Sequence, residues 1–238
     1  MFTLQDFKVK LVNGEEVKSF IKKHGEFAAV CYNTPLDRAE KVGEHCLKSG
    51  HMSGSRHLFF VFELKTVPRS AVDQLVRHYT GFVPNVQSLR YCNKDGKVNI
   101  YVAPELLQNE YMVKTIQDQE NIVNAQYNYI QTYLEESGIT GEKANEIART
   151  ILPIGVATEC SIACNIESLI HLANLRLCTR AELPIRTIIK QMVDQVVEVE
   201  PRYKPYLVPQ CKKLGYCPEN NKNCPRYKLN NKEVKKHE

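Results

Sequence analysis

The chain has 238 residues, of which 43% are hydrophobic and 25% charged, and its formal net charge is +5 at pH 7. This is enough to bury a sizeable core in one domain or in two closely packed halves. No window approaches the ~20 apolar residues of a membrane span, and the first residues lack the basic and apolar regions of a signal peptide. We therefore expect a soluble, cytoplasmic protein.

The positive charge favours anionic ligands, but it does not separate a nucleotide from a nucleic acid. The chain also contains nine cysteines, which a cytoplasmic protein keeps reduced. Six of them are scattered among apolar segments and are expected to be thiols of the core: Cys31, Cys46, Cys92, Cys160, Cys164 and Cys178.

The first quarter of the chain predicts two helices followed by a strand. Apolar residues recur at helical spacing over 16–30 and 36–49. A loop of small residues follows at 50–57, and the aromatic and branched residues of 57–67 are typical of a buried strand. A loop that leads into a strand in this way is a favourable place for a site.

The next segment combines a helix with a predicted hairpin. Pro68 is expected to start a helix that continues far enough to carry Gln74 and Arg77 on one face. Two short strands and the turn between them are then expected at 86–91, 97–103 and 93–96.

The second half of the chain is predominantly helical. Residues 105–136 form one long amphipathic stretch, which predicts a scaffold helix or an oligomer interface. A short helix is expected between Thr140, its N-cap, and Pro153. A strand at 154–165 and helices over 165–199, divided near 179–184, follow it.

These elements predict an α/β (α+β) fold, with a mixed or antiparallel sheet flanked by helices and with one long helical segment. We expect a single catalytic domain over 1–200 and an irregular tail rich in cysteine and lysine over 201–238.

The most informative segment is RHYTGFVPNVQSLRY, residues 77–91. It brings arginines, a histidine, amides and hydroxyls together with the turn formers Gly81 and Pro84, a combination suited to holding a polar anion. We interpret it as a nucleotide site.

This segment resembles a family signature. Arg77, His78 and Tyr79, eight residues, and then Ser88, Leu89 and Arg90 are similar to the Arg-His-Arg...Ser-x-Arg signature of flavin-dependent thymidylate synthases. Three further segments resemble that family in its own order. They are GHMSGSRH at 50–57, ARTILP at 148–153 and NIESLIHLANLRLCTRAELPIR at 165–186.

The resemblance implies the family's fold and an enzyme that methylates deoxyuridine monophosphate (dUMP) at C5. Methylenetetrahydrofolate would donate the carbon, and FAD reduced by NADPH would donate the hydride. It also implies a homotetramer with active sites at subunit interfaces, without membrane or nucleic-acid partners.

The resemblance also assigns the site residues. The residues for dUMP are Gln74, Arg77, Ser88, Leu89, Arg90, Arg149 and Arg176. Those for FAD are Ser53, Arg56, Arg77, His78, Tyr79, Thr80, Asn165 and His171. The catalytic residues are Arg176, His51 and Ser88. Arg176 would face the uracil ring, where a fixed cation stabilises developing negative charge.

The chain departs from the family pattern at several positions. Tyr79 replaces the last residue of Arg-His-Arg, and Glu167 stands where an arginine commonly contacts the cofactor. Glu182 and Leu183 replace the usual Gln-Trp. Each of the first two changes removes a cation from the surroundings of an anionic cofactor.

Two alternatives follow from the same residues. A divergent relative could act on another uridine nucleotide, or the chain could be a basic nucleic-acid-binding protein whose cysteine tail holds zinc. Cys211, Cys217 and Cys224 are too widely spaced for a usual zinc motif, and only Cys178 or His237 could complete a set of four. We therefore expect loop cysteines and no metal.

Overall fold

The structure is a computed structural model that describes residues 1–92 and 97–227. The predicted turn at 93–96, the lysines at the end of the tail and His237 lie outside the described residues. The contacts of the backbone divide the chain into two compact units. Unit 1 contains Met1–Lys8, Leu64–Arg77 and Pro84–Ser161, and unit 2 contains Val9–Glu63, His78–Val83 and the chain from Ile162 onward.

Four strands form one sheet in the order β1-β2-β4-β3. Their bounds are Lys8–Leu11 for β1, Phe59–Pro68 for β2, Phe82–Val86 for β3 and Ala157–Asn165 for β4. The β3–β4 pair is antiparallel, because the Gln87 amide donates to the Glu159 carbonyl while the Asn165 amide donates to the Gly81 carbonyl. The α/β class and the strands predicted at 57–67 and 154–165 are thus confirmed.

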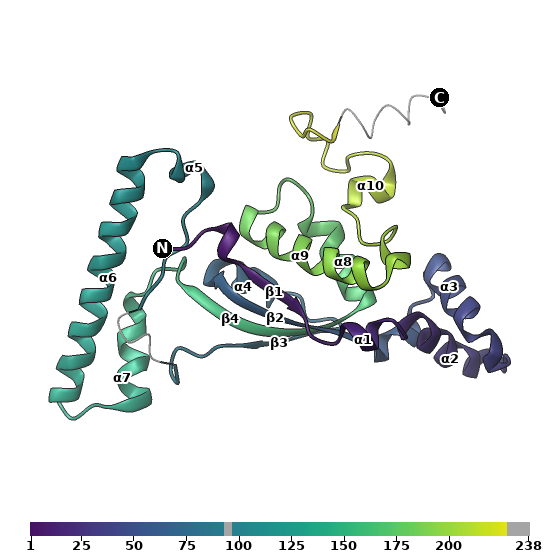
Figure 1. The fold of residues 1–238 in the computed structure, drawn as a ribbon, viewed down its shortest axis with the longest axis horizontal. Coiled ribbons are helices and arrows are strands. Elements are labelled where there is room, and N and C mark those ends of the chain that lie inside the picture. Colours follow the sequence, from purple (N-terminus) through teal and green to yellow (C-terminus); the bar gives the residue numbers. More distant parts are fainter. Residues whose placement is uncertain (93–96, 228–238) are drawn as a thin grey trace. The chain divides into compact units, whose positions relative to one another are not determined.

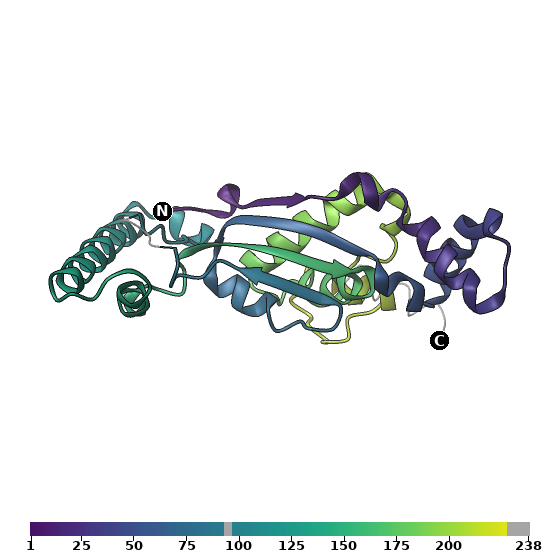
Figure 2. The same ribbon diagram turned by 90° about the horizontal axis from the view of Figure 1, so that it is seen from below.

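Ten helices lie in the described part of the chain. They are α1 Gly14–Val17, α2 Phe20–Tyr32, α3 Ala39–Ser49, α4 Arg69–Leu75, α5 Pro104–Leu107, α6 Glu110–Glu136, α7 Gly141–Ala148, α8 Ile166–Arg176, α9 Leu183–Val199 and α10 Gln210–Leu214. Short 3-10 turns are η1 Leu4–Asp6, η2 Leu36–Arg38, η3 Ser53–His57, η4 Arg149–Ile151 and η5 Pro201–Tyr203. Figures 1 and 2 show α6 beside α7 in unit 1, and α2 beside α3 in unit 2. The helical predictions are therefore largely confirmed.

The α2–α3 pair packs closely because it has glycines at its crossing. A Cβ atom on Gly25 would lie 1.7 Å from the carbonyl oxygen of Ala39, and one on Gly43 would lie 1.9 Å from that of Ile21. Between the helices the chain turns at Asn33, whose φ of 48° places it in the left-handed region that ends helices. The two helices consequently form a tight hairpin.

Each unit has its own buried side chains. In unit 1, Val98, Ile100, Val123 and Val156 form a buried cluster against which Leu152 packs. In unit 2, the buried side chains include Phe20, Phe60 and Tyr203, with the ring of Phe60 5.3 Å from that of Phe20 and 5.6 Å from that of Tyr203. Among the described helices, none combines the length and the hydrophobicity that a membrane span needs.

The predicted hairpin after α4 is wrong. The strand is β3, which precedes the predicted one, and residues 88–91 form a turn. The Ser88 hydroxyl accepts from the Arg90 amide at 3.3 Å, and the Ser88 carbonyl accepts from the amides of Tyr91 and Cys92. These amides therefore form hydrogen bonds within a turn and not with a neighbouring strand. Residues 97–103 make only isolated bridges, Phe2 with Tyr101 and Ile100 with Val156.

Three smaller expectations also need correction. Helix α4 ends at Leu75, so Arg77 lies beyond it and does not share a helical face with Gln74. The loop at 50–57 contains a 3-10 turn, η3. All nine cysteines are free, but Cys31 and Cys92 are exposed and Cys178 is half-buried, so these three are not core thiols.

Candidate functional site

The turn at Ser88–Arg90 in unit 1 is fixed by α6 and α7. Gln131 of α6 donates to Asn145 Oδ1 of α7 at 2.8 Å, and Asn145 Nδ2 donates to the Arg90 carbonyl at 2.9 Å. Gln131 and Asn145 are both buried, and hydrogen bonds between buried amides hold their partners firmly. The position of the turn therefore depends on a series of hydrogen bonds that runs from Gln131 through Asn145 to Arg90.

The Arg90 guanidinium lies against acidic side chains of α7. Its Nε is 3.4 Å from a Glu146 oxygen, and its NH2 is 3.6 Å from a Glu142 oxygen. In the part of the chain that the structure describes, this Nε is buried and makes no hydrogen bond. The Glu146 carboxylate balances the charge of this nitrogen without forming a hydrogen bond to it, so its donor capacity is left for an anionic ligand.

Arg149 ends α7 as its C-cap, one helical turn after Glu146. The pKa of the Glu146 carboxyl lies below its ordinary value, chiefly because Lys143 donates a hydrogen bond to it, with smaller contributions from the charges of Arg90 and Arg149. The structure thus brings the charges of the predicted nucleotide residues Arg90 and Arg149 close to the same side chain of α7, Glu146. Gln74 is half-buried in α4, and Arg77 is exposed just after that helix.

The segment His78–Gly81 in unit 2 is attached to the start of α8. The Asn165 side chain caps this helix by accepting from the Ser168 amide at 2.9 Å, and the Ser168 hydroxyl donates to the Thr80 carbonyl at 2.8 Å. Gly81 has a φ of 64°, and a Cβ there would lie 2.3 Å from the Asn165 amide nitrogen. Only glycine fits this position, and Asn165 has a structural role besides the cofactor contact predicted for it.

His78 faces Arg176, the residue expected at the uracil ring. The Arg176 Nε and NH2 nitrogens lie 3.4 and 3.3 Å from the His78 Nε2 atom, and the His171 ring is 5.7 Å from the His78 ring. Burial, followed by the charges of Arg176 and His171, lowers the pKa of His78 to about 4. His78 is therefore neutral near pH 7 and accepts a hydrogen bond from the guanidinium.

A hollow of about 340 Å³ in unit 2 contains other predicted cofactor residues. His51, Ser53 and Arg56 line it, together with residues of the α2–α3 hairpin such as Cys31 and Cys46. Arg56 also forms an ion pair with Glu167, in the first turn of α8, with 2.8 Å between Nε and Oε2. Glu167 stands where the family commonly has an arginine, so one cation is missing there. Its carboxylate, however, holds another cation, Arg56, at the same place. Tyr79, the other departure, is 85% exposed.

The predicted residues therefore fall into two groups. Those in unit 1 are Gln74, Arg77, Ser88, Leu89, Arg90 and Arg149. Those in unit 2 are His51, Ser53, Arg56, His78, Tyr79, Thr80, Asn165, His171 and Arg176. All but one of the residues assigned to dUMP lie in unit 1, and all but one of those assigned to FAD lie in unit 2.

The sequence reasoning missed Glu142, Asn145 and Glu146, which hold the turn around Arg90. A usable signal was present, because positions 142, 145, 146 and 149 have the spacing of one helical face. Polar residues along a face that ends at a predicted ligand residue indicate a supporting role.

Comparison with known proteins places this geometry in a family. The family model described as "Thymidylate synthase complementing protein" matches residues 20–202, which include all four motif segments. The chain belongs to this family. A relative from Nitratidesulfovibrio vulgaris, named flavin-dependent thymidylate synthase, is 36% identical over 186 residues, covering 77% of this chain and 74% of the relative. One of the same name from Pyrococcus abyssi is 32% identical and covers 76% of each chain.

Solved structures support the fold of this family member. A UMP/dUMP methylase, PolB from Streptomyces cacaoi, bound with 5-Br dUMP, superimposes with a TM-score of 0.64. The match covers 87% of this chain and 99% of that chain at 19% identity. The same enzyme bound with 5-Br UMP gives a TM-score of 0.61 at 20% identity. The chain therefore has the fold of this family, and its relatives are named flavin-dependent thymidylate synthases.

Proposed function

We propose that this family member converts dUMP to dTMP by reductive methylation at C5, with methylenetetrahydrofolate as carbon donor and NADPH as reductant of FAD. The observation that carries the proposal is the family match over residues 20–202, which contains every motif segment. The geometry of the Ser88–Arg90 turn and of the Arg176–His78 pair supports it.

The phosphate of dUMP is the ligand that suits the Ser88–Arg90 turn. A phosphate dianion is held best by a guanidinium fork and backbone amides. Arg90 has a buried Nε without a hydrogen bond among the described residues, and its carbonyl is already fixed by Asn145. Arg149, the C-cap of α7, adds a second cation whose charge acts on Glu146 as that of Arg90 does.

Arg176 is assigned the charge stabilisation. Negative charge develops on the pyrimidine when C5 is alkylated or reduced, and a cation that is already in place stabilises it without reorganisation. His78 holds the guanidinium by accepting a hydrogen bond from it. Because burial keeps His78 neutral, the histidine adds no second positive charge that would repel the guanidinium. Arg176 is thus the catalytic residue, and His78 positions it.

The residues around η3 and the start of α8 fit FAD. Imidazole, hydroxyl and guanidinium groups from His51, Ser53 and Arg56 share one hollow, and such donors suit a flavin with a pyrophosphate arm. When bound, FAD supplies the hydride chemistry. The protein supplies Arg56 as a cation, and Glu167 fixes its position.

The catalytic domain is proposed to span residues 1–200, with 201–238 as a tail. The family match, which ends at 202, supports this boundary. The cytoplasmic location remains a prediction.

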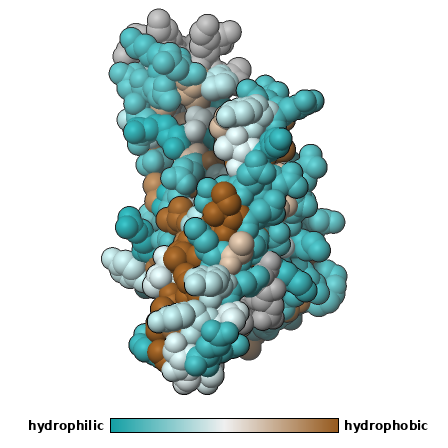
Figure 3. Space-filling view, turned by 90° about the vertical axis from the view of Figure 1, so that its left-hand side faces the viewer, coloured by the Kyte–Doolittle hydropathy of each residue, from teal (hydrophilic) through white to brown (hydrophobic). Residues whose placement is uncertain are grey.

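We also propose the homotetramer, on the basis of α6. Its buried face carries Val123, Tyr127 and Leu134. A second apolar stripe is exposed: Tyr111, Ile122, Tyr129 and Tyr133. These four are separated by 11, 7 and 4 residues, each close to a whole number of helical turns. Figure 3, where tyrosines are pale because the hydropathy scale ranks them near neutral, shows further hydrophobic residues gathered among hydrophilic ones on the side where α6 lies. A face of this kind suits a second copy of the chain.

The test is an assay with purified protein, FAD, NADPH and methylenetetrahydrofolate. Release of the C5 hydrogen of dUMP and formation of dTMP are the expected results. Reduction of bound FAD by NADPH without either product would contradict the proposal, while protein that binds no flavin would show that the family's chemistry has been lost.

The second candidate is methylation of uridine monophosphate. It is favoured by the fold match to PolB, whose description names both UMP and dUMP as substrates. Parallel assays with UMP and dUMP distinguish the two. A kcat/KM for UMP equal to or above that for dUMP would replace the first proposal with the second.

A further inference from the structure

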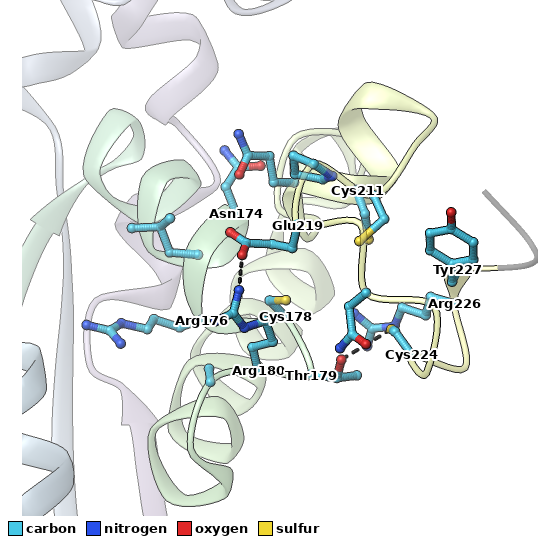
Figure 4. A pocket seen from close by; sticks show the side chains of 16 residues that line it. Asn174, Arg176, Cys178, Thr179, Arg180, Cys211, Glu219, Cys224, Arg226 and Tyr227 are labelled. Carbon is cyan, nitrogen blue, oxygen red and sulfur yellow. Dashed lines mark hydrogen bonds and ion pairs between the residues drawn. The ribbon is translucent and has the colours of Figure 1, made fainter. Parts of the chain in front are cut away.

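Four of the nine cysteines line a single cavity of unit 2. The cavity measures about 430 Å³ and lies where the end of α8 meets the segment 210–227. The four residues are Cys178, Cys211, Cys217 and Cys224. Figure 4 shows Cys178 just after α8, Cys211 on α10 and Cys224 in the loop beyond it. The structure thus joins Cys178 to the three tail cysteines, a connection that a gap of more than 30 residues conceals in the sequence.

A single metal ion does not fit this arrangement. Tetrahedral zinc requires four donors that meet at one atom, at Zn–S distances of about 2.3 Å. Within residues 1–92 and 97–227, no group of three or more His, Cys, Asp and Glu side chains could hold such an ion. The tail cysteines also lack the closely spaced Cys pair that zinc sites usually contain.

An iron–sulfur cluster makes a different demand on its ligands. Cysteine thiolates bind separate irons of the cluster, so the four sulfurs surround a volume and need not converge on a point. A cavity bordered by four cysteines from three segments meets that demand. We propose that Cys178, Cys211, Cys217 and Cys224 bind an iron–sulfur cluster, each as a thiolate that has released its proton to solvent.

The remaining lining suits a negatively charged cluster. Arg180 and Arg226 border the cavity, and the acidic Glu219 is paired with Arg180. The Thr179 hydroxyl lies 3.2 Å from the Cys224 sulfur. Positive charge and hydrogen bonds to sulfur are the means by which proteins stabilise such clusters and set their potential.

The cluster also accounts for how the tail is held. In the described segment 201–227, Tyr203 and Leu207 are the only buried residues, and α10 has five residues. A segment with so little core needs another form of attachment. Four metal–thiolate bonds tie the end of α8, α10 and the last loop together, and binding energy of this kind acts as folding energy.

The test uses the full-length protein purified without oxygen, with iron and acid-labile sulfide measured per chain. Equal amounts of the two are expected, ~2 to 4 of each, with a brown colour that persists after flavin removal and bleaches with dithionite. Cys178→Ser and Cys217→Ser, on separate segments, are each expected to lose most of the iron. Cys92→Ser is the matched control, because Cys92 is exposed and lines neither this cavity nor the hollow proposed for FAD.

Three results would overturn the proposal. They are absence of iron and sulfide after anaerobic reconstitution of the wild-type chain with ferric iron, sulfide and a thiol reductant, one zinc per chain without sulfide, or full iron retention by both serine variants. The wild-type reconstitution is decisive even if a variant fails to fold. Because iron content is measured without substrate, the result is independent of whether the protein makes thymidylate.

Discussion

The guanidinium of Arg176 points its Nε and NH2 nitrogens at a single atom, the Nε2 of His78. The two residues come from segments 98 positions apart, and His171 closes the group from α8. The histidine of the signature therefore holds the arginine that we propose to face the substrate, and only its neutral form can accept a hydrogen bond from that arginine.

This pair predicts a specific dependence of stability on pH. His78 has a pKa of about 4 in the folded protein and about 6.5 when unfolded, so the unfolded chain binds the proton more readily. The contribution of His78 is complete above pH 6.5 and is lost as the pH falls towards 4. His78→Gln should show a shallower fall in Tm between pH 7 and 4.5. His45→Gln, at an exposed position of α3, is the control, and identical slopes for the wild type and His78→Gln would refute the prediction.

The ion pair between Arg56 and Glu167 predicts the response of FAD binding. Arg56→Gln should weaken FAD about tenfold or more, because a hydrogen bond to a charged group contributes ~1.5–3 kcal/mol. Both side chains are well exposed, so stability should change by less than ~1 kcal/mol. Flavin fluorescence titration measures the affinity, and Arg38→Gln on η2 is the control. Unchanged FAD affinity in Arg56→Gln would remove Arg56 from the cofactor site.

Arg90 is expected to govern nucleotide affinity. Arg90→Gln should raise the KM for dUMP by roughly one to two orders of magnitude, since it removes one charge-assisted phosphate contact of ~1.5–3 kcal/mol. Arg90→Lys should recover only part of the loss, because lysine lacks the planar fork. Steady-state kinetics and FAD titration measure the two effects. Lys143→Gln, on the exposed side of α7, controls for the local charge, and an equal loss in that variant would argue against a specific role for Arg90.

The series of hydrogen bonds behind the turn predicts a linked loss of stability and affinity. Gln131→Leu removes the donor to Asn145 Oδ1 and should reduce the free energy of unfolding by ~1–3 kcal/mol. The KM for dUMP should rise as well, because Asn145 holds the Arg90 carbonyl. Urea unfolding and kinetics are the measurements, with the exposed Gln126→Leu on the same helix as control. A stable variant with an unchanged KM would show that the turn is held by other contacts.

The exposed stripe of α6 predicts the assembly state. The double substitution of Tyr129 and Tyr133 by Glu should convert tetramers into smaller species, because four like charges per pair of copies would be buried or brought together at that interface. Light scattering after gel filtration reports the mass. Asn121→Glu, on a different face of α6, should leave the tetramer intact. A wild-type monomer, or a double variant that remains tetrameric, would reject the α6 interface.

The sequence predicted the fold best where its local signals agreed with each other. The aromatic and branched residues of β2 and the helical spacing of α2, α3 and α6 each indicate one structure. Strand β3 was missed because Pro84 and Asn85 argue against a strand. An edge position in the sheet, which only the strand order reveals, makes proline acceptable there.

The site was predictable as a list of residues but not as an arrangement. Resemblance supplied the identities of Arg90, Arg176 and His78, whereas the acidic and amide groups that hold Arg90 come from residues 41 to 56 positions further along the chain. The gathering of Cys178 with the tail cysteines is a similar case. Contacts between distant segments depend on the tertiary fold, so the local periodicity of apolar residues does not predict them.

The close crossing of α2 and α3 has a consequence for how mutational data on this protein would be interpreted. Each added Cβ at Gly25 or Gly43 would collide with a backbone carbonyl, and no side-chain rotation relieves such a clash. In a saturation scan scored by activity, both positions should tolerate almost nothing, even alanine. They would then rank with residues proposed to bind the nucleotide, such as Arg90, although neither glycine has a side chain with which to touch a substrate.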